Sequence, residues 1–373
     1  MSQFVQLPAN PIVCQNSGAK GTETISGEET FPVISPYTGA AIGTCANTST
    51  SQVNQLVEGA HQAFTGWRDT PLKERVGPMF RFRDLLLNNS EELSHLAAAE
   101  CGKTPAEAKA GVMKGIEVVE FALSLENMDS GGAMEVSRGV TCQYRREPLG
   151  VVLGIAPFNF PAMVPLWMYP IAMTLGNSFV LKPSEKVPLT SCRIAELITE
   201  AGFPPGVFTV VHGGAKTVGD LIDHPKTQAV AFVGSTPIAK EVFIRATALG
   251  KRALTLGGAK NHLLVVPDAD AKITTPGVVN SFTGCAGQRC MAASLMVAVN
   301  QVDQQIDAIV SKAKSLELGK DMGAIISRAA LERITGIIDR AEKEGAKIIL
   351  DGRKAKAPAG YEGGFWLGPT IID

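Results

Sequence analysis

Apolar and polar positions between residues 151 and 248 change in a regular way along the chain. Short apolar runs predict strands at 151–156, 178–181, 207–211 and 229–233. The segments between and after these runs have helical spacing and predict helices near 162–175, 189–201, 215–222 and 237–248. Strands that alternate with helices imply a parallel sheet covered on both faces. Such sheets bind ligands beyond the carboxyl ends of their strands.

The chain before this unit is predicted to be mostly helical. Apolar residues at helical spacing indicate helices near 50–67, 73–87, 91–101 and 106–125, with Ser90 as the N-cap of the third. Residues 1–30 are polar and rich in Gly, Ser and Thr, and we interpret them as an arm before a short strand and a turn at 35–39. Residues 131–146 alternate and begin with Gly-Gly, which predicts an extended hairpin.

The last part of the chain predicts a second, smaller α/β unit. A strand and hinge at 254–258 lead to this unit, which we expect to open with a strand at 263–266 and to contain helices near 303–316 and 330–344. Because few strands are predicted here and the chain ends at Asp373, this unit is expected to be incomplete at its C-terminus. A length of 373 residues favours two domains. The expected fold class is therefore α/β, with a Rossmann-like parallel-sheet domain and an incomplete α/β domain.

Composition and charge exclude several classes of protein. Hydrophobic residues make up 45% of the chain, which is typical of a globular protein. The net charge is −1 with both signs mixed, so no nucleic acid or anionic membrane is expected as a partner. Seven scattered cysteines without a C-x-x-C pair suit a reducing compartment and argue against a disulfide framework or a zinc site, so we expect no metal. Residues 1–30 lack the features of a secretory signal, and a cytoplasmic location is expected.

The long uncharged segment 148–181 raises the question of a membrane span. A spanning helix needs about 20 apolar residues in succession. Prolines interrupt this segment at 157, 161, 165 and 170, and proline breaks a helix interior. We therefore interpret the segment as a buried strand, loop, helix and strand.

The segment 282–290, Phe-Thr-Gly-Cys-Ala-Gly-Gln-Arg-Cys, is predicted to be a loop between two apolar runs. Its small residues let the backbone approach a bound molecule closely. Cys290 follows the permanent cation of Arg289, which favours the thiolate, and the thiolate is the nucleophilic form. Cysteine is also among the most buried residue types, so a packing role is the alternative for Cys290.

Polar residues follow three of the predicted strands. Asn159 lies between two prolines, and its amide suits either a structural hydrogen bond or an oxyanion donor for an intermediate on Cys290. Lys182 and Glu185 at the next strand end suit either ribose hydroxyls or a surface ion pair. Ser235, at a predicted helix start, suits either a phosphate or an ordinary cap. The dinucleotide pattern G-x-G-x-x-G does not occur in the sequence.

Four motifs between residues 157 and 290 occur in one order: PFNFP at 157–161, LKPSE at 181–185, FVGST at 232–236 and GQRC at 287–290. In this order they resemble the aldehyde dehydrogenase superfamily. Within it, the stretches at 155–167, 258–262 and 286–292 are most similar to the methylmalonate-semialdehyde dehydrogenases, which are CoA-acylating members.

The resemblance implies NAD-dependent oxidation of a small semialdehyde of the malonate or methylmalonate type. Cys290 would attack the aldehyde, and Asn159 with the backbone N–H of Cys290 would hold the oxyanion. Hydride transfer to NAD would then leave a thioester. Arg289 resembles the residue that pairs with the substrate carboxylate, and Lys114 and Phe160 are expected in the same substrate site. The residues expected to contact NAD are Ala156, Phe158, Lys182, Glu185, Lys186, Ser235 and Gly257.

Thr255 distinguishes between two fates of the thioester. Hydrolytic members of the superfamily carry a Glu at this place as the base that activates water. A hydroxyl has too high a pKa to act as a base near neutral pH. A thiol such as that of coenzyme A is already partly ionised and strongly nucleophilic. The sequence therefore predicts transfer of the acyl group to CoA.

The resemblance also implies a domain organisation with some departures from the family pattern. It assigns 1–30 to an N-terminal arm, 31–130 and 149–257 to an NAD-binding domain, 131–148 to an oligomerisation hairpin and 258–373 to a catalytic domain. A dimer or tetramer is implied once the expected missing C-terminal part is supplied. Lys114 stands where the family has a second carboxylate-binding arginine, and lysine lacks the bidentate fork. The alternatives are a hydrolytic enzyme for another small aldehyde and an inactive, truncated nucleotide-binding chain.

Overall fold

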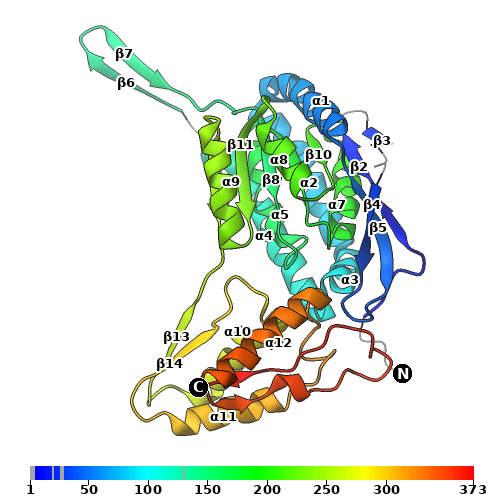
Figure 1. The fold of residues 1–373 in the computed structure, drawn as a ribbon. Coiled ribbons are helices and arrows are strands. Elements are labelled where there is room, and N and C mark those ends of the chain that lie inside the picture. The colour runs from blue at the N-terminus through cyan, green and yellow to red at the C-terminus, as the bar shows by residue number, and fades with distance from the viewer. Residues whose placement is uncertain (1–4, 19–20, 26–28, 129–130) are drawn as a thin grey trace.

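A sheet of seven strands forms the centre of the larger part of the molecule. The computed structural model describes residues 5–18, 21–25, 29–128 and 131–373. In this sheet the strand order is β12-β11-β8-β9-β10-β2-β3 (Figure 1). The strands are β2 (Asn16–Gly18), β3 (Gly21–Ile25), β8 (Val151–Ile155), β9 (Ser178–Lys182), β10 (Phe208–Val210), β11 (Thr227–Val233) and β12 (Arg252–Leu256). From β12 to β10 all neighbours are parallel, as the alternation of strands and helices predicts.

Helices cover both faces of this sheet because successive side chains of a strand point to opposite faces. In β9, Phe179 and Leu181 pack into one apolar core, whereas Val180 packs into the other. The first core is completed by α2 (Leu72–Asn88), α4 (Pro105–Met128), α6 (Tyr169–Thr174) and α7 (Leu189–Glu200). The second is completed by α1 (Thr50–Asp69), α8 (Ala215–Asp223) and α9 (Thr236–Ala248).

One predicted helix is divided in two, and one predicted N-cap is wrong. Residues 162–175 form two short helices, α5 (Met163–Leu166) and α6, because Pro170 lies at the start of α6 and cannot continue a preceding helix. The helix α3 (Ser90–Cys101) begins one residue earlier than expected, and Asn89 rather than Ser90 is its N-cap. Asn89 ends α2 as well, so the two helices share a boundary residue.

The predicted N-terminal arm contains strands. β1 (Ile12–Cys14) pairs in parallel with β5 (Ala41–Asn47), which also pairs with β4 (Glu29–Ile34), and β2 joins the edge of the main sheet beside β10. The buried Asn16 side chain holds β2 in place because its Oδ1 accepts hydrogen bonds from the His212 backbone N–H at 2.8 Å and the Thr48 hydroxyl at 3.0 Å. The remaining arm residues, 1–4, 19–20 and 26–28, lie outside the described ranges.

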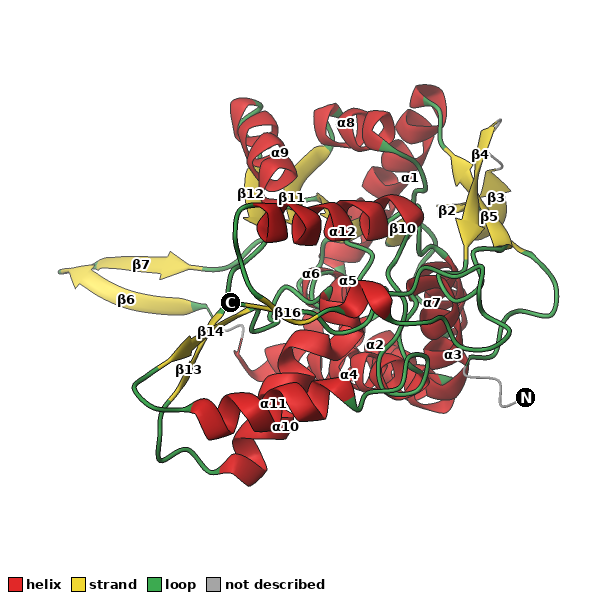
Figure 2. Cartoon of the chain, turned by 60° about the horizontal axis from the view of Figure 1, so that its bottom comes forward, coloured by secondary structure: helices red, strands yellow, loops and turns green. Residues whose placement is uncertain are grey.

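Residues 257–373 lie mostly below the main sheet in the view of Figure 1. A parallel pair, β13 (His262–Val265) and β14 (Leu295–Ala298), packs with α10 (Ala271–Thr283) and α11 (Asp303–Lys314) around a small apolar core. Figure 2 shows α10 and α11 side by side, with α12 (Arg328–Lys343) in front of the main sheet in this view. The final strands are β15 (Ile348–Leu350) and β16 (Ile371–Ile372), with a 3-10 turn at Gly352–Lys354.

The helix α10 was not expected from the sequence. Pro276 and neighbouring threonines obscure its helical pattern, but the Asp270 side chain caps its start by accepting from the Lys272 backbone N–H at 2.8 Å. This helix leads directly into the Gly-Cys-Ala-Gly turn. It therefore determines where the loop that carries Cys290 begins.

The hairpin predicted at 131–146 is present as β6 (Gly132–Ser137) and β7 (Val140–Tyr144), which pair antiparallel and extend away from the rest of the molecule (Figure 1). Its exposed side chains include the apolar Met134, Val136, Val140 and Tyr144. Within the described residues, no helix is both long and apolar enough to span a bilayer.

Candidate active site

A cavity of about 1950 Å³ lies between the carboxyl ends of the main-sheet strands and residues of the C-terminal part. Turns after β8, β9, β11 and β12 form one wall, and the loop at 286–290 with parts of α11, α12 and β16 forms the other. The cavity brings together ten of the residues singled out from the sequence: Ala156, Phe158, Asn159, Lys182, Glu185, Lys186, Ser235, Gly257, Arg289 and Cys290.

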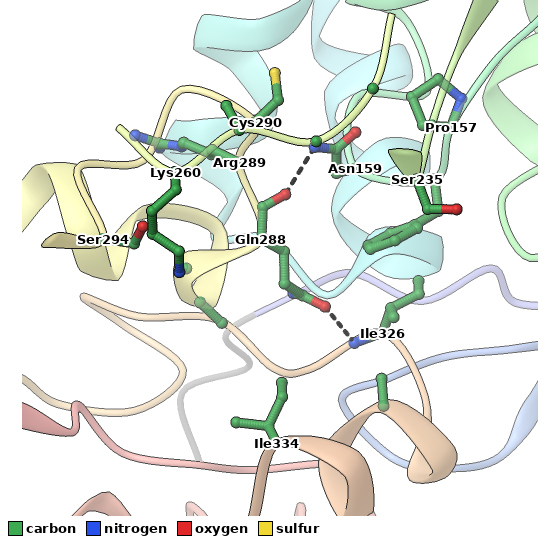
Figure 3. A pocket seen from close by; sticks show the side chains of 18 of the residues that line it. Pro157, Asn159, Ser235, Lys260, Gln288, Arg289, Cys290, Ser294, Ile326 and Ile334 are labelled. Atoms are coloured by element: carbon green, nitrogen blue, oxygen red, sulfur yellow. Dashed lines mark hydrogen bonds between the residues drawn. The ribbon is translucent and has the colours of Figure 1, made fainter. Parts of the chain in front are cut away.

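The loop that carries Cys290 begins with an unusual backbone. It leaves α10 through a 3-10 turn (Gly284–Gly287) in which Cys285 and Ala286 have φ of 53° and 51°. This left-handed region is costly for residues with a Cβ, and such strain is typical of functional loops. The Gln288 side chain fixes the turn, because its Nε2 donates to the Cys285 carbonyl and its Oε1 accepts from the Ile326 N–H, each at 3.0 Å (Figure 3).

Cys290 lies at the end of this loop and is partly exposed to the cavity. Its backbone carbonyl accepts a hydrogen bond from Asn261 Nδ2 at 2.8 Å, and the same nitrogen also donates to the Ala292 carbonyl. One side chain, Asn261, thus holds the backbone at Cys290 and two residues after it. A partly exposed thiol on a fixed loop is accessible to a small electrophile.

Asn159 approaches the same loop from the turn after β8. Its Nδ2 donates to the Gln288 carbonyl at 2.7 Å, and the side chain is 9% exposed (Figure 3). An amide nitrogen carries two N–H groups, and this bond occupies one of them. The structural hydrogen bond that the sequence allowed for Asn159 is therefore present. The same bond fixes the amide near the loop of Cys290.

The polar residues at the other strand ends lie on the opposite wall of the cavity. Lys182 is buried, and burial lowers the pKa of its ammonium, while Glu185 at 3.5 Å opposes this shift. The Lys182 ammonium also donates to the Gly213 carbonyl at 3.1 Å. Ser235 is the N-cap of α9 and lines the cavity, and its side chain makes no capping hydrogen bond to the helix.

The short segment 257–261 connects the two walls. The Gly258 N–H donates to the hydroxyl of Thr236, the first residue of α9, at 3.0 Å. At the other end of the segment, Asn261 holds the Cys290 carbonyl. At Gly257 an added Cβ would lie 2.9 Å from the Thr236 hydroxyl oxygen, so the close approach requires glycine.

Two of the expected substrate residues do not line the cavity. The Lys114 ammonium pairs with Glu117 at 2.9 Å on the surface of α4, where its side chain is 65% exposed. Phe160 lies under the buried Lys103 ammonium, which is 3.4 Å from the ring centroid. Thr255 lies on β12 opposite Phe232 and is also absent from the cavity wall.

Sequence reasoning missed Glu107, which bonds from the start of α4 to the loop that carries Cys290. Glu107 accepts hydrogen bonds from the Cys285 N–H at 2.7 Å and from Arg289 at 2.9 Å. The pattern Thr104-x-x-Glu107 was visible as a capping box, and the two residues do bond reciprocally at the start of α4. That signal predicts the helix start but not the contact with Arg289. Within the described residues, no cluster of three or more His, Cys, Asp or Glu could hold a metal ion.

Comparison with known proteins relates this geometry to a family. The aldehyde dehydrogenase family model matches residues 23–373. Malonate-semialdehyde dehydrogenase 2 of Geobacillus kaustophilus is 41% identical over 364 residues, which cover 95% of this chain and 75% of that protein. Malonate-semialdehyde dehydrogenase of Pseudomonas aeruginosa is 41% identical over 352 residues, 91% of this chain and 70% of that protein.

Solved structures give the same relationship. Methylmalonate-semialdehyde dehydrogenase from Oceanimonas doudoroffii matches with a TM-score of 0.94 at 39% identity, covering 97% of this chain and 75% of the other. A protein from Sinorhizobium meliloti 1021, solved in complex with NAD and named for the same activity, matches with a TM-score of 0.95 at 36% identity, covering 98% and 76%. The similarity confirms the α/β fold class expected from the sequence.

Proposed function

The chain belongs to the aldehyde dehydrogenase family, and from that premise we propose that it oxidises malonate or methylmalonate semialdehyde and transfers the acyl group to coenzyme A. The observation that carries the proposal is that one cavity is lined both by Cys290 and Arg289 and by the turns at the strand ends of the main sheet. Relatives named for the two semialdehydes support the choice of substrate.

The residues on the strand-end wall fit NAD. Ser235 and the start of α9 are suited to a phosphate, because a helix N-terminus carries partial positive charge and free N–H donors, although Pro237 contributes none. Lys182 and Glu185 lie at the tip of β9, where charged groups can bond ribose hydroxyls. Ala156, Phe158, Lys186 and Gly257 complete the proposed binding surface. When bound there, NAD supplies a hydride acceptor.

The loop residues would carry the acyl chemistry. Cys290 attacks the aldehyde carbon and forms a hemithioacetal, whose oxyanion accepts hydrogen bonds from the Asn159 amide and the Cys290 backbone N–H. Loss of hydride then leaves a thioester on Cys290. Arg289, next to Cys290 in the chain, would bind the substrate carboxylate through its planar guanidinium.

Thr255 supports transfer to a thiol rather than hydrolysis. Its hydroxyl cannot act as a general base near neutral pH, and the residue does not reach the cavity wall. The thiol of coenzyme A needs less help because part of it is ionised at neutral pH. In this proposal residues 31–130 and 149–257 bind NAD, residues 258–373 carry the nucleophile, and the exposed apolar side chains of the hairpin contact another subunit.

The test is NADH formation by the purified chain with malonate semialdehyde and NAD, with and without coenzyme A. Sustained turnover is expected with CoA, and a single turnover limited by the stable thioester without it. The acyl-CoA product is measured by mass spectrometry. Equal rates of sustained NADH formation with and without CoA would refute transfer to CoA and favour the hydrolytic alternative.

A further inference from the structure

The Glu107 carboxylate connects α4 to the loop of Cys290. Its side chain is only 16% exposed. Oε1 accepts from the Cys285 backbone N–H at 2.7 Å and from Arg289 Nη2 at 2.9 Å. Oε2 accepts from the Thr104 N–H and hydroxyl, each at 3.2 Å. One oxygen is therefore fixed by the helix start and the other holds the loop.

The Arg289 guanidinium is confined on a second side by Gly284. A Cβ at Gly284 would lie 2.3 Å from the guanidinium carbon, so the group rests directly against the loop backbone. Its Nε is buried and has no hydrogen-bond partner within the described chain. A buried donor without a partner is unfavourable, and a carboxylate is the acceptor that best matches a guanidinium.

We propose that Glu107 is the positioning residue for carboxylate recognition in this chain. By holding Nη2 of Arg289 and the Cys285 N–H with one oxygen, it sets the direction of the remaining guanidinium donors relative to Cys290. An electrophile that carries a carboxylate is thereby favoured over an uncharged one of the same shape. The inference rests on the proposed role of Arg289 in binding the substrate carboxylate.

The strained turn explains why such a tether is needed. Cys285 and Ala286 both have left-handed φ, a conformation that persists only where surrounding contacts enforce it. Glu107 bonds to the amide of the first of these residues and to the side chain four positions later. Glu107 thus fixes the segment that precedes Cys290 at both ends, at Cys285 and at Arg289.

Three variants separate position from charge. Glu107→Ala removes the acceptor oxygen, and Glu107→Asp keeps the charge but withdraws the carboxylate by one methylene. Glu107→Gln keeps the side-chain length and one acceptor oxygen for the loop, removes the charge, and puts an NH₂ group in place of the oxygen that accepts from Thr104. Glu120→Gln is the matched control, because Glu120 lies on the same helix and pairs with Arg83 at 2.7 Å, away from the cavity.

The experiment measures alkylation of Cys290 by 3-bromopropionate and by its uncharged amide, 3-bromopropionamide. In the first reagent the attacked carbon and the carboxylate have the same spacing as in malonate semialdehyde. Trypsin cleaves after Arg289 and Lys312, so the peptide 290–312 contains Cys290 as its single cysteine and its modification is followed by mass spectrometry. The readout is the ratio of the two alkylation rates, and it requires neither NAD nor turnover.

We expect the ratio to fall about tenfold in Glu107→Ala and about fivefold in Glu107→Asp, and to stay within about twofold of wild type in Glu107→Gln and Glu120→Gln. A general disturbance of the loop slows both reagents together and leaves the ratio unchanged, which would overturn the proposal. A Glu107→Gln ratio as low as that of Glu107→Ala would also overturn it. If Glu107→Ala fails to fold, Glu107→Asp decides.

The proposed function fails separately. It is judged by NADH and acyl-CoA formation, which the alkylation assay does not use. The ratio of the two alkylation rates is also measured on free cysteine. If the ratio for the wild-type chain is no higher than that for free cysteine, Arg289 does not bind the carboxylate as proposed. If the wild-type chain prefers 3-bromopropionate and the Glu107→Ala and Glu107→Asp variants keep the same ratio, only the proposed role of Glu107 is refuted.

Discussion

Replacing Asn159 by alanine should separate the acyl chemistry from the reactivity of the thiol. The change removes the hydrogen bond from Nδ2 to the Gln288 carbonyl, which is 2.7 Å long in a side chain 9% exposed. It also removes the side-chain donor proposed for the oxyanion. The two losses differ in size, and that difference makes the experiment informative.

The expected magnitudes follow from the kind of bond that each loss breaks. A buried hydrogen bond between neutral groups contributes about 0.5–1.5 kcal/mol to the free energy of unfolding. A donor aimed at a developing oxyanion contributes about 3–4 kcal/mol to the transition state, which corresponds to a change in kcat of about 100-fold or more. We therefore expect Asn159→Ala to lower kcat about 100-fold while the free energy of unfolding falls by about 1 kcal/mol.

Two assays on the same preparation test this expectation. NADH formation with malonate semialdehyde reports the step that passes through an oxyanion. Alkylation of Cys290 by iodoacetamide is a direct displacement at carbon and forms no oxyanion, so its rate should stay within about threefold of wild type.

Asn177→Ala is the matched control for this substitution. Asn177 is also a buried amide, 7% exposed, with Oδ1 bonded to the backbone N–H groups of Leu149 and Gly150, but it does not line the cavity. It should lose stability without losing kcat. The reasoning is refuted if Asn159→Ala retains kcat within about tenfold, or if alkylation of Cys290 slows in parallel with NADH formation.

Two further predictions concern other parts of the molecule. Burial raises the pKa of Glu100 from 4.5 to about 8, although hydrogen bonds from Thr190 and Leu189 oppose the shift. The folded chain then holds a proton that the unfolded chain releases above about pH 4.5, so the free energy of unfolding should fall as pH rises toward 8. Glu100→Gln should flatten that fall in urea titrations at about pH 5, 6.5 and 8, and identical slopes for both proteins would contradict it. Ser235→Asp places a negative charge at the start of α9 and should raise the KM for NAD about tenfold with kcat little changed. Both constants are measured from NADH formation over a range of NAD concentrations. An unchanged KM would argue against a phosphate at this helix.

Most helices and the parallel strands could be predicted because their side chains repeat with strong periods. The helix α1 shows this clearly, since Val53, Leu56, Val57 and Ala60 recur at helical spacing and all are buried in the structure. The first three strands could not be predicted in the same way. They are three to five residues long, and their polar residues gain partners only when the strands dock, as Asn16 does with Thr48 and the His212 backbone.

The candidate site shows the same division. Local motifs placed Asn159, Lys182, Ser235 and Cys290 correctly at strand ends or in a loop, because short sequence patterns determine those positions. The contact between Arg289 and Glu107 joins residues 182 positions apart and leaves no local pattern. Lys114 illustrates the converse, because a charge on α4 could be recognised in the sequence although only the structure shows it paired with Glu117 outside the cavity.

The segment 257–261 has a consequence for communication between the two walls of the cavity. It is bonded at one end to the first residue of α9 and at the other to the carbonyl of Cys290, so its length sets the separation between a helix tip and a nucleophile. We therefore expect a ligand that displaces the start of α9 to shift the backbone of Cys290 as well. By thermodynamic reciprocity, an adduct on the sulfur alters the affinity at the helix by the same factor.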